Sequence, residues 1–376
     1  MTVYTEFQPL KKILIGSTYR PDVFEYHSDK EFVDMMSTIF EETQEDLDKL
    51  AKICSDYGAE VVRPKVVLEP KDEINIGINT GTFANHPMQP RDVIGKFGNT
   101  IIEGYSKEIT RYFENWSYRD VIKEEFRNGS RVISMPTPEI SADDGYDTLD
   151  DRDEFVFHTA NVVKCGKHLF HTQSARDARG KSVKHPVSGR GTQAGLLWME
   201  RELLEFEFEE VPAGGHLDGK IAIIRPGLVV AWNEDHVPQM MKDDKWDIII
   251  AGDRKKFYRG VGIFSDLFLN KKHNYNLGFP KYFEDIRNSM PYKLYVQDYL
   301  SHWIGYVEET VFHVNTISLD ENTVIMTGYN KDVYKKLEKH GIDVINWDAK
   351  HRFFWDGGAH CCSIDLNREG EQENYF

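Results

Sequence analysis

Short apolar runs recur along the chain in a regular order. Four pairs of such runs enclose a turn of Gly, Pro-Gly or Asp-Glu-Asn, a pattern typical of a β-hairpin. These candidate hairpins lie at 92–102, 161–170, 221–230 and 314–326. A further apolar run at 10–16 precedes them and predicts mainly a single strand.

Helical patterns follow most of these strands. In the clearest one, between 31 and 57, Phe32, Met36, Phe40 and Leu47 recur at helical spacing with acidic residues between them. Each unit then ends with one more apolar run, at 59–63, 131–134, 208–211, 247–250 or 342–345. Five strand–turn–strand–helix–strand (ββαβ) modules predict an α/β fold closed into a radial array. An open doubly wound sheet would need strands and helices to alternate one to one, which the hairpins contradict.

Composition narrows the class of protein. The chain has 376 residues, 40% hydrophobic and 12% aromatic, which indicates a folded protein with a large core. A formal net charge of −16 argues against nucleic-acid and anionic-membrane partners. No apolar run is long enough to cross a bilayer, the N-terminal residues do not resemble a signal sequence, and four cysteines do not make a disulfide framework. We therefore expect a soluble, cytoplasmic protein.

Two stretches interrupt the modules. The segment 141–153 is acidic and poor in apolar residues, which predicts an exposed loop. The segment 174–195 is rich in Gly, Ser, Arg and Lys, which is typical either of a mobile lid or of a simple insertion. Near its end, Thr192 is placed to cap the helix that contains Leu196 and Trp198.

The run Asp-Gly-Gly-Ala-His-Cys-Cys at 356–362 is the strongest candidate for chemistry. Paired glycines would leave an open approach to a nucleophilic thiol, and the adjacent His360 would favour the thiolate of Cys361 or Cys362. The alternative is a turn of small residues with two buried thiols, since free cysteine is commonly a core residue.

Polar residues also stand at the starts of three hairpins, where a closed array would turn them toward a shared central pocket. Asp92, His158 and the pair His216 and Asp218 occupy these places. On a strand, positions i and i+2 face the same side, so we expect His216 and Asp218 to project together as a proton carrier and a cation anchor. The nearby set Cys165, His168 and His171 fits no common zinc pattern, and we predict neither a metal site nor a cofactor.

Taken in order, these motifs resemble the glycine and inosamine-phosphate amidinotransferases of the guanidino-group-modifying superfamily. The resemblance runs almost end to end and implies one domain over 1–376, folded as a five-bladed α/β propeller, the pentein fold. The matching segments are 8–16, Pro90-Arg-Asp-Val, 98–103, Arg111-Tyr-Phe-Glu, Pro136-Thr-Pro, His216-Leu-Asp, 225–229, 337–341, the Gly-Gly-x-His-Cys run and Asp365.

The resemblance also implies roles for single residues. Cys361 matches a nucleophile that attacks the central carbon of a guanidinium, and His216 matches the general acid and base. Asp92 and Asp218 match carboxylates that grip the planar cation. Further substrate contacts are implied for Asn161, Asn315 and Gly358.

Two departures from the family pattern stand out. His158 replaces an Asp that pairs with the catalytic His, although Asn161 in the same motif fits. After the fourth hairpin, Asp235 and His236 stand where members carry an Arg for a substrate α-carboxylate, and 303–315 is longer than its counterpart. We expect altered substrate handling or weakened catalysis, because a protonated His158 would repel a cationic donor.

The leading prediction is therefore an amidinotransferase that uses a small-molecule guanidino donor, arginine by resemblance, and an amine acceptor in natural-product biosynthesis. A guanidine hydrolase of the same superfamily is the first alternative. A catalytically weak propeller that acts as a binding protein is the second. A homodimer is left open.

Overall fold

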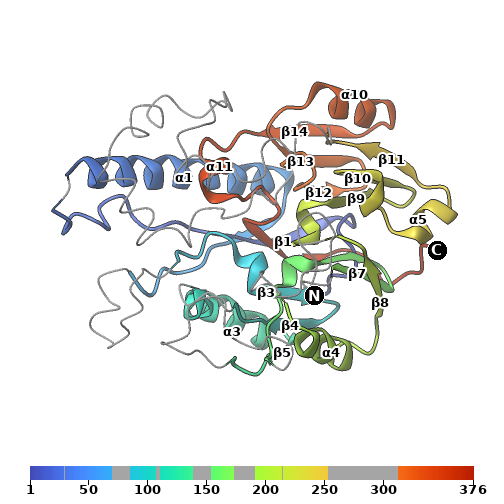
Figure 1. Cartoon of the computed structure of the whole chain (residues 1–376), viewed down its shortest axis with the longest axis horizontal. Helices are drawn as coiled ribbons and strands as arrows, with labels where there is room; N and C mark the ends of the chain where they lie inside the picture. Colours follow the sequence, from blue (N-terminus) through green and yellow to red (C-terminus); the bar gives the residue numbers. More distant parts are fainter. Residues whose placement is uncertain are drawn as a thin grey trace.

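The computed structural model describes residues 1–28, 30–69, 85–106, 111–138, 154–172, 191–213, 215–252 and 312–376. The predicted loop at 141–153, most of the stretch at 174–195 and most of the segment at 303–315 lie outside these residues. Within them the strands form five separate three-stranded sheets. Strands such as β1 and β3 lie toward the middle of the view in Figure 1, while α3, α4 and α10 lie toward its edge.

Four sheets share one pattern, which confirms the four predicted hairpins and their closing strands. In each, an antiparallel hairpin is followed by a third strand parallel to the hairpin's second strand. The strands are β3 (Ile94–Phe97), β4 (Thr100–Glu103) and β5 (Arg131–Ser134); β6 (Val162–Cys165), β7 (His168–Thr172) and β8 (Glu207–Val211); β9 (Ile221–Arg225), β10 (Leu228–Ala231) and β11 (Asp247–Ile250); and β12 (Ile317–Asp320), β13 (Thr323–Thr327) and β14 (Asp343–Trp347).

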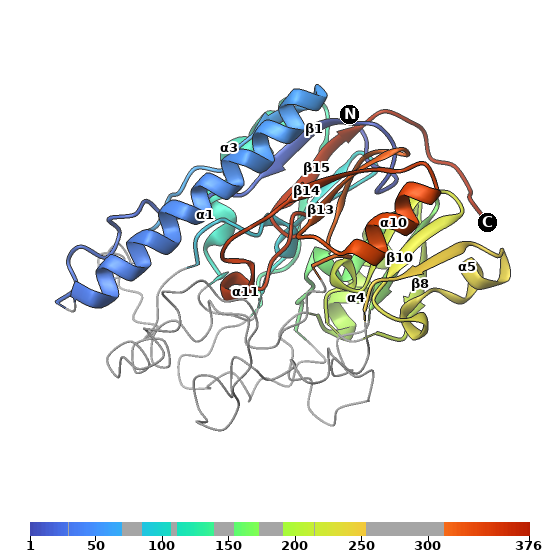
Figure 2. The same ribbon diagram turned by 90° about the horizontal axis from the view of Figure 1, so that it is seen from above.

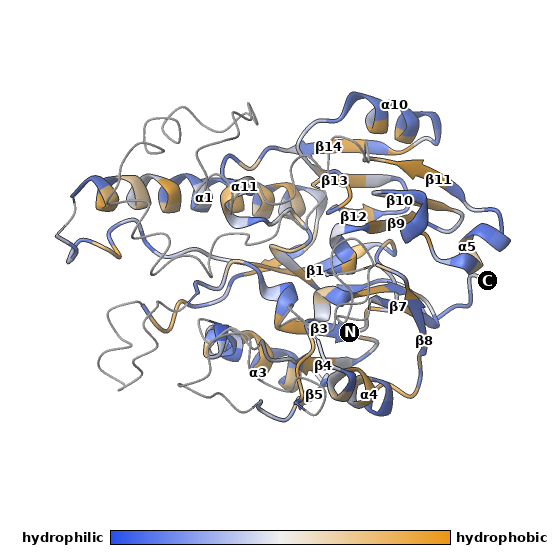
Figure 3. Ribbon diagram, viewed as in Figure 1, coloured by the Kyte–Doolittle hydropathy of each residue, from blue (hydrophilic) through white to orange (hydrophobic). Residues whose placement is uncertain are grey.

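A helix precedes the third strand of every sheet. The helices are α1 (Lys30–Tyr57), α3 (Arg119–Arg127), α4 (Gln193–Glu202), α5 (Gln239–Asp243) and α10 (Lys331–Lys339). The predicted helix at 31–57 is confirmed as α1, whose apolar face packs into a core with Trp347 and Trp355. Thr192 caps α4 as predicted, because its side chain accepts a hydrogen bond from the Gly195 N–H. Figure 2 shows α1 and α10 on the outside of the strands, and Figure 3 shows apolar residues along the strands.

The first sheet joins the two ends of the fold. Its order is β15 (Ser363–Arg368), β1 (Leu10–Ile15) and β2 (Glu60–Val62), with β15 antiparallel to β1 and Ile13 opposite Asp365. The apolar pattern did not predict β15, since four of its six residues are polar. Three of these polar side chains are nevertheless buried, and Arg368 donates to Asp365 inside the protein at 3.1 Å.

A buried ionic cluster connects the first two sheets. Lys96 on β3 pairs with Glu125 on α3 at 2.6 Å, and both side chains are fully buried. Lys12 on β1 reaches the same carboxylate at 3.3 Å and the half-exposed Glu124 at 2.6 Å. Since ammonium groups in a protein interior must be paired, this cluster fixes the position of α3 against both sheets.

Candidate active site

Three single-turn 3-10 helices contain, or directly follow, five of the eight predicted site residues. They span Pro90–Asp92, Thr159–Asn161 and Leu217–Gly219, and each precedes the first strand of a hairpin. The first turn contacts the second, and the second contacts the third. Asp218 lies in a turn and His216 directly before it, and neither is on a strand, which corrects the prediction of their local structure. They still meet the other site residues, because the turns converge at one end of the sheets.

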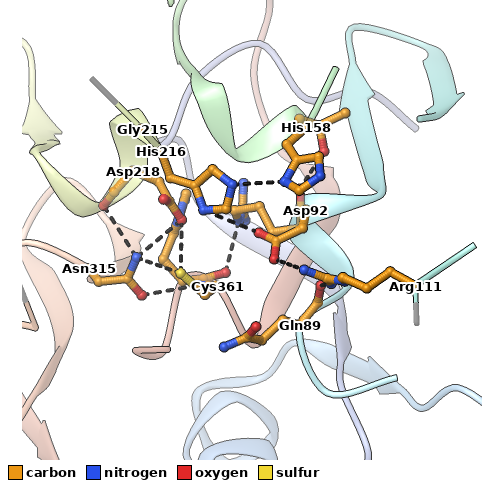
Figure 4. Close-up of polar contacts among 12 residues, drawn as sticks. Gln89, Asp92, Arg111, His158, Gly215, His216, Asp218, Asn315 and Cys361 are labelled. Carbon is orange, nitrogen blue, oxygen red and sulfur yellow. Dashed lines mark hydrogen bonds and ion pairs between the residues drawn. The ribbon is translucent and has the colours of Figure 1, made fainter. Parts of the chain in front are cut away.

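Cys361 is held by the side chain of Asn315, which stands just before β12. The Asn315 amide donates to Sγ at 3.0 Å, and its carbonyl oxygen accepts from the Cys361 N–H at 3.0 Å. The same amide donates to Asp218 Oδ2 at 3.1 Å, and Sγ itself lies 3.4 Å from that oxygen. Figure 4 shows Asn315, Asp218 and Cys361 gathered on one side of His216. The thiol and one predicted carboxylate thus share a single hydrogen-bonded cluster.

His216 contacts two further predicted residues. Its Nε2 atom and Nδ1 of His158 share a hydrogen bond of 2.9 Å, and its Nδ1 atom lies 3.6 Å from Asp92 Oδ1. His158 therefore contacts His216, as the resemblance implied for the Asp that His158 replaces. Because one hydrogen bridges the two rings, the pair accommodates one positive charge but not two.

Asp92 is oriented by Arg111, for which the sequence indicated only a place in a family motif. Arg111 donates to Asp92 Oδ2 and, at 2.7 Å, to Glu114. Burial raises the pKa of Glu114, and Tyr118 donates to the same carboxyl at 2.8 Å. The spacing of Arg111 and Glu114, three residues apart, was a signal for this pair, but their contact with Asp92 is not visible in the sequence.

Asp218 is held by a second network that sequence reasoning missed. His360 Nδ1 lies 3.0 Å from Asp218 Oδ2, and its Nε2 lies 3.1 Å from Glu6, which pairs with Lys164 at 2.7 Å. All four side chains are buried. Although burial alone would raise it, the hydrogen bond and charge of His360 keep the pKa of Asp218 below its ordinary value. His360 thus lies between the two carboxylates within hydrogen-bonding distance of both, and it holds Asp218 in place.

The prediction that the surroundings of Cys361 favour the thiolate is wrong in this state of the protein. Burial, followed by the charges of Asp218 and Asp92, raises the pKa of the Cys361 thiol well above its ordinary value. His360 is engaged with two carboxylates instead. A cation placed between the carboxylates would offset the two electrostatic causes.

The two glycines before the cysteines serve packing, which differs from the open approach expected of them. A Cβ on Gly358 would come within 2.6 Å of Asn315 Oδ1 and 2.9 Å of Thr327 Oγ1. A Cβ on Gly357 would come within 2.2 Å of the Gln89 amide. Glycine is needed because these side chains close around the loop and hold Cys361 in place.

Two carboxylate oxygens in the site are poised for a ligand. Asp92 Oδ1 and Asp218 Oδ1 are buried, and among the described residues neither accepts a hydrogen bond. A buried carboxylate oxygen without a donor is costly. A guanidinium offers five N–H donors in one plane, and it can satisfy carboxylates on more than one side.

Other predicted residues lie nearby with different contacts. The Asn161 N–H donates to the His158 carbonyl at 3.0 Å, which closes its turn. Cys362 is buried in the core around α1. His236 is buried against Trp232, and Asp235 is exposed. None of the helices in the described part of the chain is long and apolar enough to span a membrane.

Comparisons of sequence find amidinotransferases among the relatives of this chain. No protein-family model matches the chain. Inosamine-phosphate amidinotransferase 1 of Streptomyces glaucescens is 25% identical over 100% of this chain and 99% of its own length. Glycine amidinotransferase of Xenopus laevis is 24% identical over 99% of this chain and 84% of its own length. The L-arginine:L-lysine amidinotransferase of Pseudomonas savastanoi pv. phaseolicola is 25% identical over 99% and 96%.

Solved structures share the fold. Inosamine-phosphate amidinotransferase from Streptomyces griseus aligns with a TM-score of 0.66 and 21% identity, over 100% of this chain and 98% of its own. An amidinotransferase of the saxitoxin pathway from Microseira wollei gives 0.64 and 20%, over 100% and 99%. The fold class is thus that of α/β pentein enzymes. In its sequence motifs, in its relatives over essentially the whole chain and in its fold, the chain is similar to the inosamine-phosphate and glycine amidinotransferases.

Proposed function

We propose that the protein transfers an amidino group from a guanidino donor to an amine through a covalent amidino intermediate on Cys361. One observation carries this proposal: the Cys361 thiol lies beside Asp218, while the His158–His216 pair contacts Asp92 on the other side. A planar cation bound between Asp92 and Asp218 would present its central carbon to the Cys361 thiol.

Binding of the donor supplies the charge that the free site lacks. The guanidinium donates to the free oxygens of Asp92 and Asp218, and its positive charge offsets the electrostatic rise in the pKa of the Cys361 thiol. The Cys361 thiol is therefore deprotonated mainly when the donor is bound. A thiol that stays protonated in the free enzyme is also protected from oxidation, because the thiolate is the reactive form.

The chemical step then follows from the positions of the groups. Sγ forms a bond to the guanidinium carbon, and the bond from that carbon to the departing nitrogen breaks. The proton that the thiol loses ends on the leaving amine, with His216 as its carrier. In the second half-reaction the acceptor amine gives its proton to His216 and attacks the same carbon. The C–S bond then breaks, and the proton on His216 returns to the sulfur, which restores both Cys361 and His216.

The substrates are inferred from the relatives. Their names specify an inosamine phosphate, glycine, and arginine with lysine, and one structural neighbour acts in a toxin pathway. We therefore propose arginine as donor and a small amine of natural-product biosynthesis as acceptor. The absence of the expected Arg near His236 favours an acceptor that differs from glycine.

For the architecture, we propose that the five sheets are the blades of one closed propeller and that residues 1–376 form a single domain. Two observations support this. β15 pairs with β1 and so links the ends of the chain. The relatives align over essentially the whole chain.

The test follows the intermediate and both products. The protein is incubated with arginine, with and without candidate amines, and the Cys361 peptide is analysed by mass spectrometry while ornithine and citrulline are measured. We expect an amidino adduct on Cys361 and ornithine release that depends on an acceptor. Cys361→Ser should abolish both, whereas Cys362→Ser, the matched control one residue away, should retain them. Citrulline without an acceptor would indicate a hydrolase, and no adduct with arginine or any other guanidine would refute both enzymatic readings.

A further inference from the structure

Three side chains at the site form a cluster that the sequence did not predict to bind a metal. Asp92, His158 and His216 are all buried, and one ligand atom from each lies within 4.8 Å of the other two. Asp92 ends one hairpin-leading turn, and His158 and His216 each directly precede another, so their distance along the chain matches no metal-ligand spacing rule. Two imidazoles and one carboxylate are a common ligand set for a divalent transition metal.

The spacing of the two imidazoles suits such an ion. Their facing nitrogens are 2.9 Å apart in the hydrogen-bonded state. Two nitrogens bound tetrahedrally at about 2.0–2.1 Å from Zn²⁺ are roughly 3.4 Å apart. Loss of the bridging proton and an opening of about half an ångström therefore convert the hydrogen bond into a pair of metal ligands.

Asp92 faces the other nitrogen of the His216 ring. Arg111 holds Oδ2 of Asp92, and Oδ1 lies 3.6 Å from Nδ1 of His216, whereas Nε2 of the same ring faces His158. One ligand atom from each of the three residues nevertheless lies within 4.8 Å of the other two, so a turn of the Asp92 carboxylate toward Nε2 would complete the set. Outer contacts such as that of Arg111 fix the orientation of a metal ligand and commonly change affinity by tenfold to about a hundredfold.

His158 decides which ion the cluster selects. With an Asp at this position the set would contain two carboxylates and one imidazole. Such a set also accepts harder cations such as Mn²⁺ or Mg²⁺ and is therefore less selective. With His it contains two nitrogens, and affinity follows the order that favours Cu²⁺, Ni²⁺ and Zn²⁺. The residue that departs from the family pattern is thus the one that supplies the second nitrogen ligand.

We propose that Asp92, His158 and His216 form a reversible site for a divalent transition metal of the Zn²⁺ class, and that the bound ion excludes the guanidino substrate. Binding of the ion needs only the geometry above. Exclusion rests on the proposed function, because the ion would occupy the lone pair of His216 and the oxygen of Asp92 that the substrate needs. The site would act as an inhibitory one.

Direct binding is measured on the full-length protein with Co²⁺ as the probe and no substrate present. We expect one equivalent to give visible d–d absorbance, which Zn²⁺ then displaces. His158→Asn should weaken binding at least about tenfold, and His158→Asp, which keeps the polar contact with His216, should fall between it and the parent. Circular dichroism identifies variants that fail to fold, and Co²⁺ affinity is compared with the parent only for variants that fold.

A second cluster provides the matched control. His168 lies 3.9 Å from both Glu207 and Glu209 at the surface and can also attract a cation. His168→Gln should leave the Co²⁺ spectrum unchanged. Loss of the signal in His168→Gln, its retention in both His158 variants, or no signal in the parent would overturn the proposed site.

Methylguanidine, which does not chelate metals, separates this inference from the proposed function. If both are right, it should displace Co²⁺ from the parent in a concentration-dependent way. If it fails to do so while binding still requires His158, the metal site stands and the proposed guanidinium position is refuted.

Discussion

Restoring the family's carboxylate at position 158 tests how His158 changes the chemistry of His216. The contact between the two rings is made by Nδ1 of His158, 2.9 Å from His216 Nε2. Nδ1 is bonded to Cγ, as Oδ1 is in aspartate and asparagine. Both His158→Asp and His158→Asn can therefore keep this hydrogen bond without a longer reach, and they differ from one another in charge alone.

The size of the effect follows from Coulomb's law. An imidazolium and a carboxylate whose charge centres are about 4 Å apart attract by about 1 kcal/mol in water and about 4 kcal/mol at an effective dielectric constant of 20. The imidazolium forms when His216 carries the proton in either half-reaction. If that energy is realised in the transition state, the turnover number of His158→Asp should exceed that of His158→Asn by about fivefold to about a thousandfold.

The assay measures kcat and KM for arginine and two other guanidines across pH 6–9, with the parent and both variants. We expect His158→Asp to exceed the parent as well, because a histidine at this position supplies the hydrogen bond without the negative charge. Equal rates and equal donor range for the Asp and Asn variants would refute the reasoning, since they would show that charge at this position does not reach the reaction.

Three more predictions concern charge in the interior. Asp92→Asn should speed the alkylation of Cys361 by iodoacetamide, because it removes a negative charge that raises the pKa of the thiol. The rate is measured by mass spectrometry of the Cys361 peptide, and slower alkylation would contradict this reasoning. The same variant should stop amidino transfer. Glu125→Gln should lower the free energy of unfolding in urea by about 3–5 kcal/mol, since the buried ammonium of Lys96 loses its carboxylate partner and that of Lys12 loses one of its partners. The half-exposed Glu124→Gln should cost under about 1 kcal/mol, and equal losses would contradict this. Burial lowers the pKa of His86 to about 3, so the free energy of unfolding should fall by up to about 5 kcal/mol as the pH drops from about 6.5 toward 3, where only the unfolded chain binds the proton. His86→Phe should flatten that part of the urea-midpoint profile, and an unchanged slope would argue against this assignment.

Local patterns were enough to predict most of the fold. The four hairpins, their closing strands and α1 were found because apolar residues repeat with the period of a strand or a helix. β15 was not found, because its partner is at the other end of the chain and its buried polar residues form pairs instead of an apolar stripe. Pairing that stabilises polar residues in the interior leaves no periodic signal.

For the candidate site, the sequence indicated which residues matter but not what they touch. Cys361, His216, Asp92 and Asp218 were identified by motif, and the structure brings them together. The supports were missed for a common reason. Glu6 and Arg111 act through contacts with residues far from them in the chain, and no local pattern records that His360 would be taken up by two carboxylates.

The pairing of β1 with β15 also determines when the first sheet can be completed during synthesis of the chain. Ile13 is synthesised before the strands of the other four sheets and its partner Asp365 after them, so the edge of β1 stays unpaired with β15 while those sheets are made. During that time it is an unpaired strand edge, which other chains can pair with and chaperones can shield. Cys361 lies two residues before β15 and takes its place beside Asn315 and Asp218 as that strand docks. The thiol therefore joins the site after the strands of the other four sheets have been made.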